Sequence, residues 1–360
     1  MVTIVITSPH RLDATKYFAH HRLHKRFVKL VGAQNFVGKS EKKVYICYQK
    51  ALNQVKTIIK MITKLEQLIE AVRSRGKRRI VVAYAEDAHT LQAVNQAVQH
   101  GIVDAILIGN RKNIAKVAAE EGIDLADFII QEEADDVACV NRAVKMINAG
   151  EADILMKGLV STDKYMRGIL QKDGGLVPAK ATLSHITVLE LPMYHKLLIV
   201  TDVAVLPAPD LSQKIQLTKN VISCANTLGI KNPKIALITP TEQMLPGIPS
   251  CVDAAIISKM AERGQIPGAI IDGPLALDVA IDPETVKIKK LHSPVGGDAD
   301  GLVFPNLEAA NVFFKSATKL CGAKLAAIVV GAKAPCVLTS RGDSEESKLY
   351  SIALASLSAK

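Results

Sequence analysis

The feature that most constrains the fold is the alternation of short apolar runs with helical patterns between residues 61 and 360. The apolar runs have the length of strands and lie at 79–84, 103–109, 152–157, 197–202, 235–239, 269–272 and 326–331. The segments with helical spacing lie at 62–74, 88–99, 111–121, 135–148, 163–172, 211–228, 252–263, 307–320 and 344–358. This rhythm predicts an α/β fold in which mostly parallel sheets carry helices on both faces.

The length of the chain predicts more than one domain. A chain of 360 residues exceeds what one ordinary hydrophobic core holds. The segment 173–185 is rich in Gly and Pro, which is typical of a crossing between domains. We expect domain I to comprise residues 61–182 plus 330–360, and domain II to comprise residues 183–329.

The first sixty residues differ from the remainder in charge. They contain 12 Lys and Arg against two acidic residues, whereas residues 61–360 contain 33 of each kind. We expect 1–60 to be a basic extension upstream of Met61, with a targeting or nucleic-acid-binding arm as the alternative. Residues 33–40 have the spacing of a phosphate loop but lack its glycines, so we do not expect ATP there. The neutral remainder is typical of a metabolic enzyme, and we expect no nucleic-acid partner.

Two further patterns bear on the compartment. No run of 18 apolar residues exists, so we expect no membrane span. The six cysteines are scattered and form no Cys-x-x-Cys pair, which argues against structural zinc and against a disulfide framework. We therefore expect a cytoplasmic protein.

One strand-to-helix turn near the C-terminus carries several reactive groups. The apolar run from Cys336 ends at Ser340 and Arg341, and Asp343 and Glu346 follow at the start of a helical pattern. Such turns present backbone N–H groups and a positive helix end to an anion, and a guanidinium adds a fork that fits phosphate. The alternative is a helix cap, with Asp343 as the N-cap and Glu346 three residues on.

A second turn has similar chemistry. A strand ends at Lys157. Ser161 and Thr162 then lead into a helix, and Arg167 lies one turn further on. In open α/β sheets, ligands bind beyond the carboxyl ends of the strands, so two anion-friendly turns in one sheet support each other. The alternative is again a Ser or Thr cap with solvated charges around it.

Other polar positions are less informative. Asp202 follows an apolar strand, and Asp298 and Asp300 form a pair that is compatible with a metal, although the glycines around them indicate a turn. His185 and His292 have no Ser or Cys partner in the sequence, so we expect structural or solvent-exposed roles for them.

Together, five segments resemble the phosphate acetyltransferase/butyryltransferase family, over about residues 70–360 and in the right order. They are Lys-Gly-Leu-Val-Ser-Thr at 157–162, Ser-Lys-Met-Ala-Glu-Arg-Gly-Gln at 258–265, Asp-Gly-Pro-Leu-Ala-Leu-Asp at 272–278, Asp-Ala-Asp-Gly-Leu-Val-Phe-Pro-Asn at 298–306, and Ser-Arg-Gly at 340–342. The versions at 157–162 and 339–341 look closer to the butyryl branch.

The resemblance implies a reversible reaction in which acyl-CoA and phosphate give acyl phosphate and CoA. It also implies a two-domain fold like that of isopropylmalate dehydrogenases, a cleft between the domains, and a homodimer or higher homo-oligomer. Coenzyme A is then a substrate, and no metal, nicotinamide or permanently bound cofactor is expected.

The family's functional residues map onto both turns. Its serine-arginine pair corresponds to Ser340 and Arg341, its helix arginine to Arg167, and its phosphate-side hydroxyl to Ser161 or Thr162. Its catalytic Asp lies seven residues beyond the serine, where this chain has a serine instead. The adjacent Glu346 is therefore our first candidate for the base, and Asp343 is the second.

Two alternatives come from other functional classes. One is an NAD-dependent dehydrogenase of the isopropylmalate or isocitrate type, because the expected fold is shared; it would need a metal-binding Asp cluster. The other is a non-catalytic domain that binds CoA or acyl phosphate. The retained Ser340, Arg341 and Arg167 argue against the second.

Overall fold

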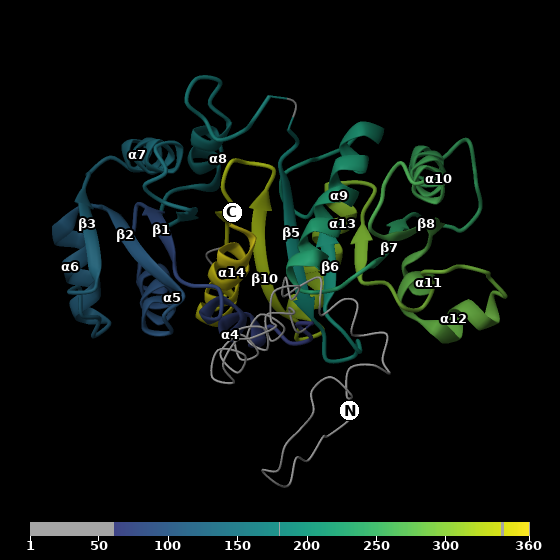
Figure 1. The fold of residues 1–360 in the computed structure, drawn as a ribbon, viewed down its shortest axis with the longest axis horizontal. Helices are drawn as coiled ribbons and strands as arrows, with labels where there is room; N and C mark the ends of the chain where they lie inside the picture. The colour runs from purple at the N-terminus through teal and green to yellow at the C-terminus, as the bar shows by residue number, and fades with distance from the viewer. Residues whose placement is uncertain (1–60, 180, 340–341, 360) are drawn as a thin grey trace, which may run out of the picture. The chain divides into compact units, whose positions relative to one another are not determined.

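The computed structural model describes residues 61–179, 181–339 and 342–359. Residues 61–360 form one compact unit (Figure 1). The predictions for residues 1–60, including the phosphate-loop spacing at 33–40, lie outside the described residues, as do Ser340 and Arg341. Within the described part, no helix is long and apolar enough to cross a membrane.

The strands form a single sheet in the order β3-β2-β1-β4-β11-β10-β5-β6-β9-β7-β8. Their bounds are β1 Arg78–Ala83, β2 Val103–Gly109, β3 Phe128–Glu132, β4 Ile154–Lys157, β5 Ser184–Glu190, β6 Leu198–Thr201, β7 Lys234–Ile238, β8 Ile270–Leu275, β9 Gly301–Val303, β10 Lys324–Val330 and β11 Cys336–Val337. The prediction of an α/β fold with a mostly parallel sheet is confirmed.

Helices cover the sheet as the alternating pattern predicts (Figure 1). Their bounds are α4 Gln67–Arg73, α5 Ala88–Gln99, α6 Arg111–Glu120, α7 Asp136–Asn148, α8 Thr162–Leu170, α9 Leu211–Thr227, α10 Pro249–Glu262, α11 Leu277–Ile281, α12 Pro283–Ile288, α13 Leu307–Lys319 and α14 Glu345–Ser358. Most predicted helices agree with these bounds to within a few residues. The boundary between domains I and II stays a prediction, because one continuous sheet runs through both segments.

The sheet reverses direction at its centre. β1 to β5 and β11 run one way, whereas β6 to β10 run the other way, because the pairs β11–β10, β10–β5 and β5–β6 are antiparallel. All other pairs are parallel. The carboxyl ends of the strands in the two halves therefore point in opposite directions.

The register offsets the two halves and brings those ends together. His185 of β5 pairs with Val329, which pairs with Cys336, which pairs with Leu155, two residues before the end of β4. Thr187, two residues further along β5, pairs with Val200, which lies one residue before the end of β6. The ends of β4, β11 and β6 consequently meet near the centre of the sheet.

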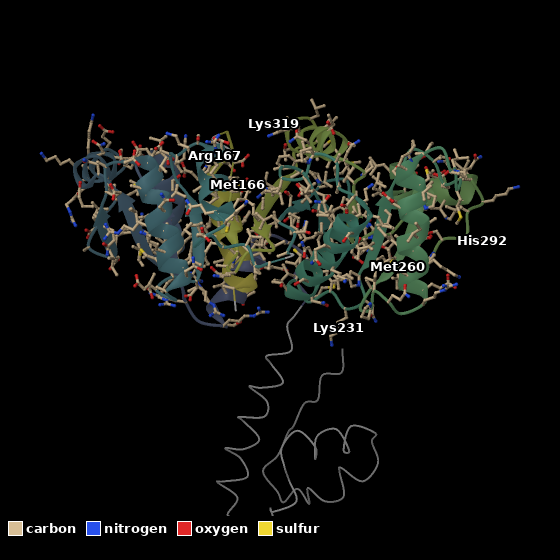
Figure 2. The ribbon with its side chains drawn as sticks, turned by 90° about the horizontal axis from the view of Figure 1, so that it is seen from above. Met166, Arg167, Lys231, Met260, His292 and Lys319 are labelled. Carbon is tan, nitrogen blue, oxygen red and sulfur yellow. The ribbon has the colours of Figure 1, made fainter. Side chains whose placement is uncertain are left out.

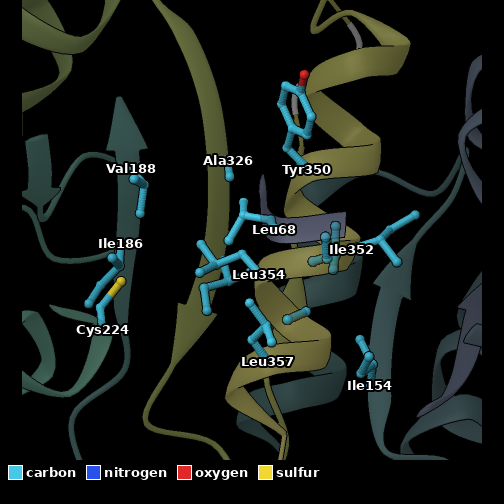
Figure 3. Packing of buried hydrophobic residues seen from close by; sticks show 14 of the residues in the cluster. Leu68, Ile154, Ile186, Val188, Cys224, Ala326, Tyr350, Ile352, Leu354 and Leu357 are labelled. Carbon is cyan, nitrogen blue, oxygen red and sulfur yellow. The ribbon is translucent and has the colours of Figure 1, made fainter. Parts of the chain in front are cut away.

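Helix α14 is the central helix of the core. Its residues 347–357 are all buried, and it packs against β10, α5 and α4. Figure 3 shows Leu354 and Leu357 of α14 beside Ala326 of β10, with Ile154 of β4 on the other side. Because small residues alternate with leucines on α14, the helix can lie close to the sheet on one side and to helices on the other.

The sequence analysis missed β3, β5 and β9 and the short helices α11 and α12. The sequence did not predict β5 because polar His185 and Thr187 interrupt its apolar pattern, although both side chains are buried. β9 has only three residues and follows the Gly- and Asp-rich segment at 297–300. In each case pairing with neighbouring strands, which the local pattern does not record, determines the strand.

Candidate functional site

The turn after β4 is held against the turn after β1. The amide of Gly158 donates to Ala83 O at 2.9 Å, and the amide of Leu159 donates to Tyr84 O at 2.8 Å. A Cβ atom on Gly158 would lie 2.2 Å from Tyr84 O, so only glycine allows the two backbones to approach this closely. The two turns therefore form one surface at the carboxyl ends of β1 and β4.

Lys157, the last residue of β4, lies buried beneath this surface. Its Nζ donates to the carbonyl oxygens of Gly158 at 3.0 Å and Val160 at 3.1 Å. A buried ammonium group needs such partners because it has lost water. Lys157 thus shapes the turn and also adds a positive charge to it.

The start of α8 shows how the hydroxyls of this turn differ. Ser161 is the N-cap, and its Oγ accepts from the Lys164 amide at 3.3 Å, as the capping alternative expects. Thr162 is exposed. Arg167 is also exposed, and it pairs with Asp163 of its own helix at 3.0 Å. Figure 2 shows Arg167 beside Met166 at the surface of the molecule.

The turn after β11 leads into α14 at Ser344. The Ser344 hydroxyl is the N-cap and accepts from the Ser347 amide at 3.2 Å. The capping alternative with Asp343 as the N-cap and Glu346 three residues on is therefore wrong, because Asp343 precedes the cap. This leaves the Asp343 carboxylate at the turn itself.

The two carboxylates proposed as bases have different surroundings. Glu346 accepts from Lys324 Nζ and from Tyr350 OH, both at 2.9 Å. Burial raises the pKa of Glu346, but these two hydrogen bonds outweigh burial and lower it. Burial lowers the pKa of the His185 ring, and the charge of Asp343 partly opposes that lowering.

A pocket of 140 Å³ lies between the two turns. Lys157 and Leu159 line it from the first turn, Thr339 and Lys348 from the second turn and α14, and His89 from the start of α5. The structure therefore brings the predicted residue Lys157 together with Lys348, which sequence reasoning missed.

Lys348 is buried, with 4% exposure, and its Nζ donates to Asp343 O at 3.0 Å. The sequence did hold a signal for it. Lys348 is the single charged residue among positions 347–357, a stretch of α14 that is otherwise small or apolar. A charge in a helix that is buried all round points to a specific electrostatic role. Two buried ammonium groups in one pocket suit an anionic ligand.

A second buried polar cluster lies at the end of β6. Asp202 accepts from the amides of Ala204 and Val205 at 2.8 Å each, and from the amide of His185 at 3.2 Å. Burial lowers the pKa of His185 and raises the pKa of Asp202, so it favours the neutral form of both groups. His185 is thus buried beside Asp202, whereas His292 is exposed.

Lysine side chains form ion pairs with Asp298 and Asp300. Asp298 lies 2.8 Å from both Lys196 Nζ and Lys234 Nζ and 2.9 Å from His195 Nε2, and Asp300 shares Lys196 at 2.8 Å. Burial alone would raise the pKa of Asp298, but these hydrogen bonds hold it well below its ordinary value. Ion pairing accounts for both side chains without a metal ion. Across the described residues, no three His, Cys, Asp or Glu side chains gather as metal ligands.

Cys336 lies in β11, next to the second turn, but it is a poor nucleophile. Burial raises the pKa of its thiol to about 12. Because the thiolate is the reactive form, a covalent intermediate on this cysteine is not favoured near neutral pH.

Comparisons with known proteins give an independent result. The family described as "Phosphate acetyl/butaryl transferase" matches residues 63–140 and 131–356. The chain is 42% identical over 297 residues to the phosphate butyryltransferase of Clostridium acetobutylicum, covering 82% of this chain and 98% of that protein. It is 39% identical over 297 residues to the phosphate acetyltransferase of Thermotoga maritima, covering 81% and 99% respectively.

A solved structure agrees with these sequence matches. The crystal structure of a branched-chain phosphotransacylase from Enterococcus faecalis V583 superposes with a TM-score of 0.68 at 31% identity. The match covers 79% of this chain and all of that one. Both sequence and fold therefore relate residues 61–360 to proteins of the same kind.

Proposed function

Because this chain belongs to the phosphate acetyl/butyryl transferase family, we propose that it transfers a short acyl group between coenzyme A and inorganic phosphate. The observation that carries the proposal is the pocket that Lys157 and Lys348 line together with Thr339, the residue before Ser340 in the sequence. An anion-binding pocket at the carboxyl ends of strands is what a phosphate substrate requires. The identity to a phosphate butyryltransferase supports a butyryl-type substrate.

The reaction needs no redox step. An oxygen of phosphate attacks the thioester carbonyl, a C–O bond forms, and the C–S bond breaks when the tetrahedral centre collapses. CoA leaves as a thiolate and takes up a proton. In the reverse direction a base removes the thiol proton, because a thiol with a pKa of about 8.5 is mostly protonated at neutral pH.

We assign roles to the residues of the two turns on this basis. Lys157 and Lys348 hold the phosphate, with Ser161, Thr162 and Arg167 as further binding residues. Ser340 donates to the developing oxyanion, and Arg341 holds phosphoryl oxygens with its planar fork. Binding both substrates in one orientation supplies much of the remaining acceleration.

For the base we now favour Asp343 over Glu346, which reverses the order from sequence alone. A carboxylate whose pKa is lowered by Lys324 and Tyr350 is a weak proton acceptor, and these partners hold Glu346 on the outer side of α14. Asp343 lies in the turn itself, before the cap of α14.

We further propose that the two halves of the sheet form two domains as in isopropylmalate dehydrogenases, with the substrates in a cleft between them. The reversal of strand direction at β10 and β5 supports this division. We also infer a cytoplasmic homodimer or higher homo-oligomer. Val312 and Leu320 on the outer side of α13, which are 65% and 82% exposed, support burial against another copy.

The test follows thiol release from acetyl-, propionyl- and butyryl-CoA with and without phosphate. We expect phosphate-dependent release, with butyryl-CoA preferred over acetyl-CoA by a modest factor, because one methylene contributes only about 1–3 kcal/mol. CoA should raise Tm, whereas NAD with Mg²⁺ should not. Absence of phosphate-dependent release would defeat the proposal. If Arg341→Ala releases thiol at the wild-type rate, only the assignment of the site is defeated.

A further inference from the structure

His185 is a buried titratable residue that the proposed reaction does not use. Its ring Nε2 lies 3.3 Å from the carbonyl oxygen of Leu338, and its Nδ1 lies 3.3 Å from Thr187 Oγ1. Its backbone is fixed on both sides: the amide donates to Asp202, and the carbonyl accepts from Thr201 Oγ1 at 3.1 Å. The ring therefore bridges the β5–β6 pair and Leu338, the first residue after β11.

These contacts assign the tautomer. A carbonyl oxygen only accepts, so Nε2 of His185 must carry the proton. Burial favours the neutral ring, in which Nδ1 is an acceptor and the Thr187 hydroxyl donates to it. The charged groups that face the ring are Asp202 after β6, Asp343 in the turn before α14 and Lys315 on α13.

The turn needs such an external contact. β11, the strand that precedes it, consists of only two residues, which pair with β10 at one position and with β4 at two. The pairing ends at Val337, so it does not fix the chain beyond that residue. The hydrogen bond to Leu338 O acts at the first residue beyond β11, where a small rotation would displace Thr339 from the pocket.

We propose that His185 is a positioning residue for acyl transfer: its ring holds the Leu338 carbonyl and so sets the course of the chain at Thr339, which lines the pocket and immediately precedes Ser340 in the sequence. This inference rests on the proposed function. It also links segments that are distant in the sequence, because a residue on β5, supported by Asp202 after β6, holds the chain that follows β11.

The test uses His185→Leu, which removes the donor, and His185→Gln, whose amide replaces the Nε2 donor. We expect His185→Leu to lower kcat by about 10²-fold, the usual effect of a misplaced catalytic group, while KM for acyl-CoA stays within twofold. His185→Gln should restore most of the lost kcat. A residue with a purely structural role would show no such rescue.

The matched control is Tyr194→Phe. Tyr194 OH donates to Ala299 O at 2.7 Å, so this change also deletes a hydrogen bond from a side chain to a backbone carbonyl, at the opposite end of β6. It should lose Tm but keep kcat. Wild-type kcat in folded His185→Leu, equal losses in His185→Leu and His185→Gln, or an equal loss in Tyr194→Phe would each overturn the inference.

A further variant keeps the inference testable if His185→Leu does not fold. Thr187→Val removes the hydroxyl that contacts Nδ1 of the ring while keeping the shape of the side chain. We expect it to lower kcat with an unchanged KM for acyl-CoA, and unchanged kcat would overturn the inference. An inactive wild-type protein would instead defeat the proposed function.

Discussion

The two ends of β6 each carry a histidine and an aspartate, and the two pairs behave in opposite ways. At the carboxyl end, His185 and Asp202 are buried, and Asp202 accepts from three backbone amides. At the amino end, His195 and Asp298 are substantially exposed and two lysines join them. Burial raises the pKa of Asp202, whereas the lysines hold that of Asp298 well below its ordinary value.

The difference shows that residue type alone does not mark a site. Asp298 is satisfied by permanent counter-ions and needs no ligand. Asp202 instead fixes the backbone at the start of β5 and directly after β6. The carboxylates of that turn repeat the contrast: Glu346 is bound to Lys324 as Asp298 is to its lysines, and Asp343 lies by the buried pair.

The largest expected effect extends the contrast to these two carboxylates. Asp343→Asn should lower kcat by about 10²–10⁴-fold, the usual contribution of a general base. Glu346→Gln should leave kcat near wild type, because it only breaks contacts to Lys324 and Tyr350. Single-turnover assays in the CoA-consuming direction across pH measure both. A larger loss in Glu346→Gln would restore the preference that the sequence alone suggested.

The next effect is on stability. Asp202→Ala should cost about 3 kcal/mol of unfolding free energy, because it leaves buried amides without an acceptor. Asp298→Ala should cost about 1 kcal/mol, since its side chain is 41% exposed and solvent screens its ion pairs. Urea unfolding at pH 7 compares the two, and equal costs would remove the distinction between the two ends of β6.

The pH dependence of stability separates the pairs further. The pKa of Asp298 is lowered in the folded state, so its stabilisation is present above the unfolded pKa of about 3.9 and lost as pH falls further. The pKa of His185 is also lowered, so its contribution is present above about 6.5 and lost as pH falls below that value.

We therefore expect each of two variants to reduce the pH dependence of stability in one pH range. His185→Gln should reduce the loss of stability between pH 7 and 5, and Asp298→Asn should reduce the loss below pH 4. Urea titrations at several pH values give both slopes. If Asp298→Asn instead changes the loss of stability between pH 7 and 5, the ion pairs seen at the amino end of β6 do not persist in solution.

The smallest expected effect concerns the first sixty residues. A chain that begins at Met61 retains both ends of β6 and all matched family positions, so we expect kcat and Tm close to those of the full chain. Activity assays and thermal melts of both chains test this. Loss of most activity or of soluble protein would show that residues 1–60 contribute to the site or to the core.

The sequence by itself determined the class of fold and the positions of both turns. Strand and helix patterns are local, so β1, β2 and α5 could be predicted closely, and Lys157 could be placed at the end of a strand. Five motif segments, with those at 157–162 and 340–342 among them, together sufficed to predict the family, because a motif records chemistry that does not depend on knowing the packing.

Only the tertiary structure decided which groups meet. Lys157 and Lys348 are 191 positions apart, and nothing local indicates that they line one pocket. The same holds for His185 and Leu338, which are 153 positions apart and which the register of β5, β10 and β11 brings together. Strand pairing and burial set these contacts and the pKa values that follow from them, because both depend on residues distant in the chain.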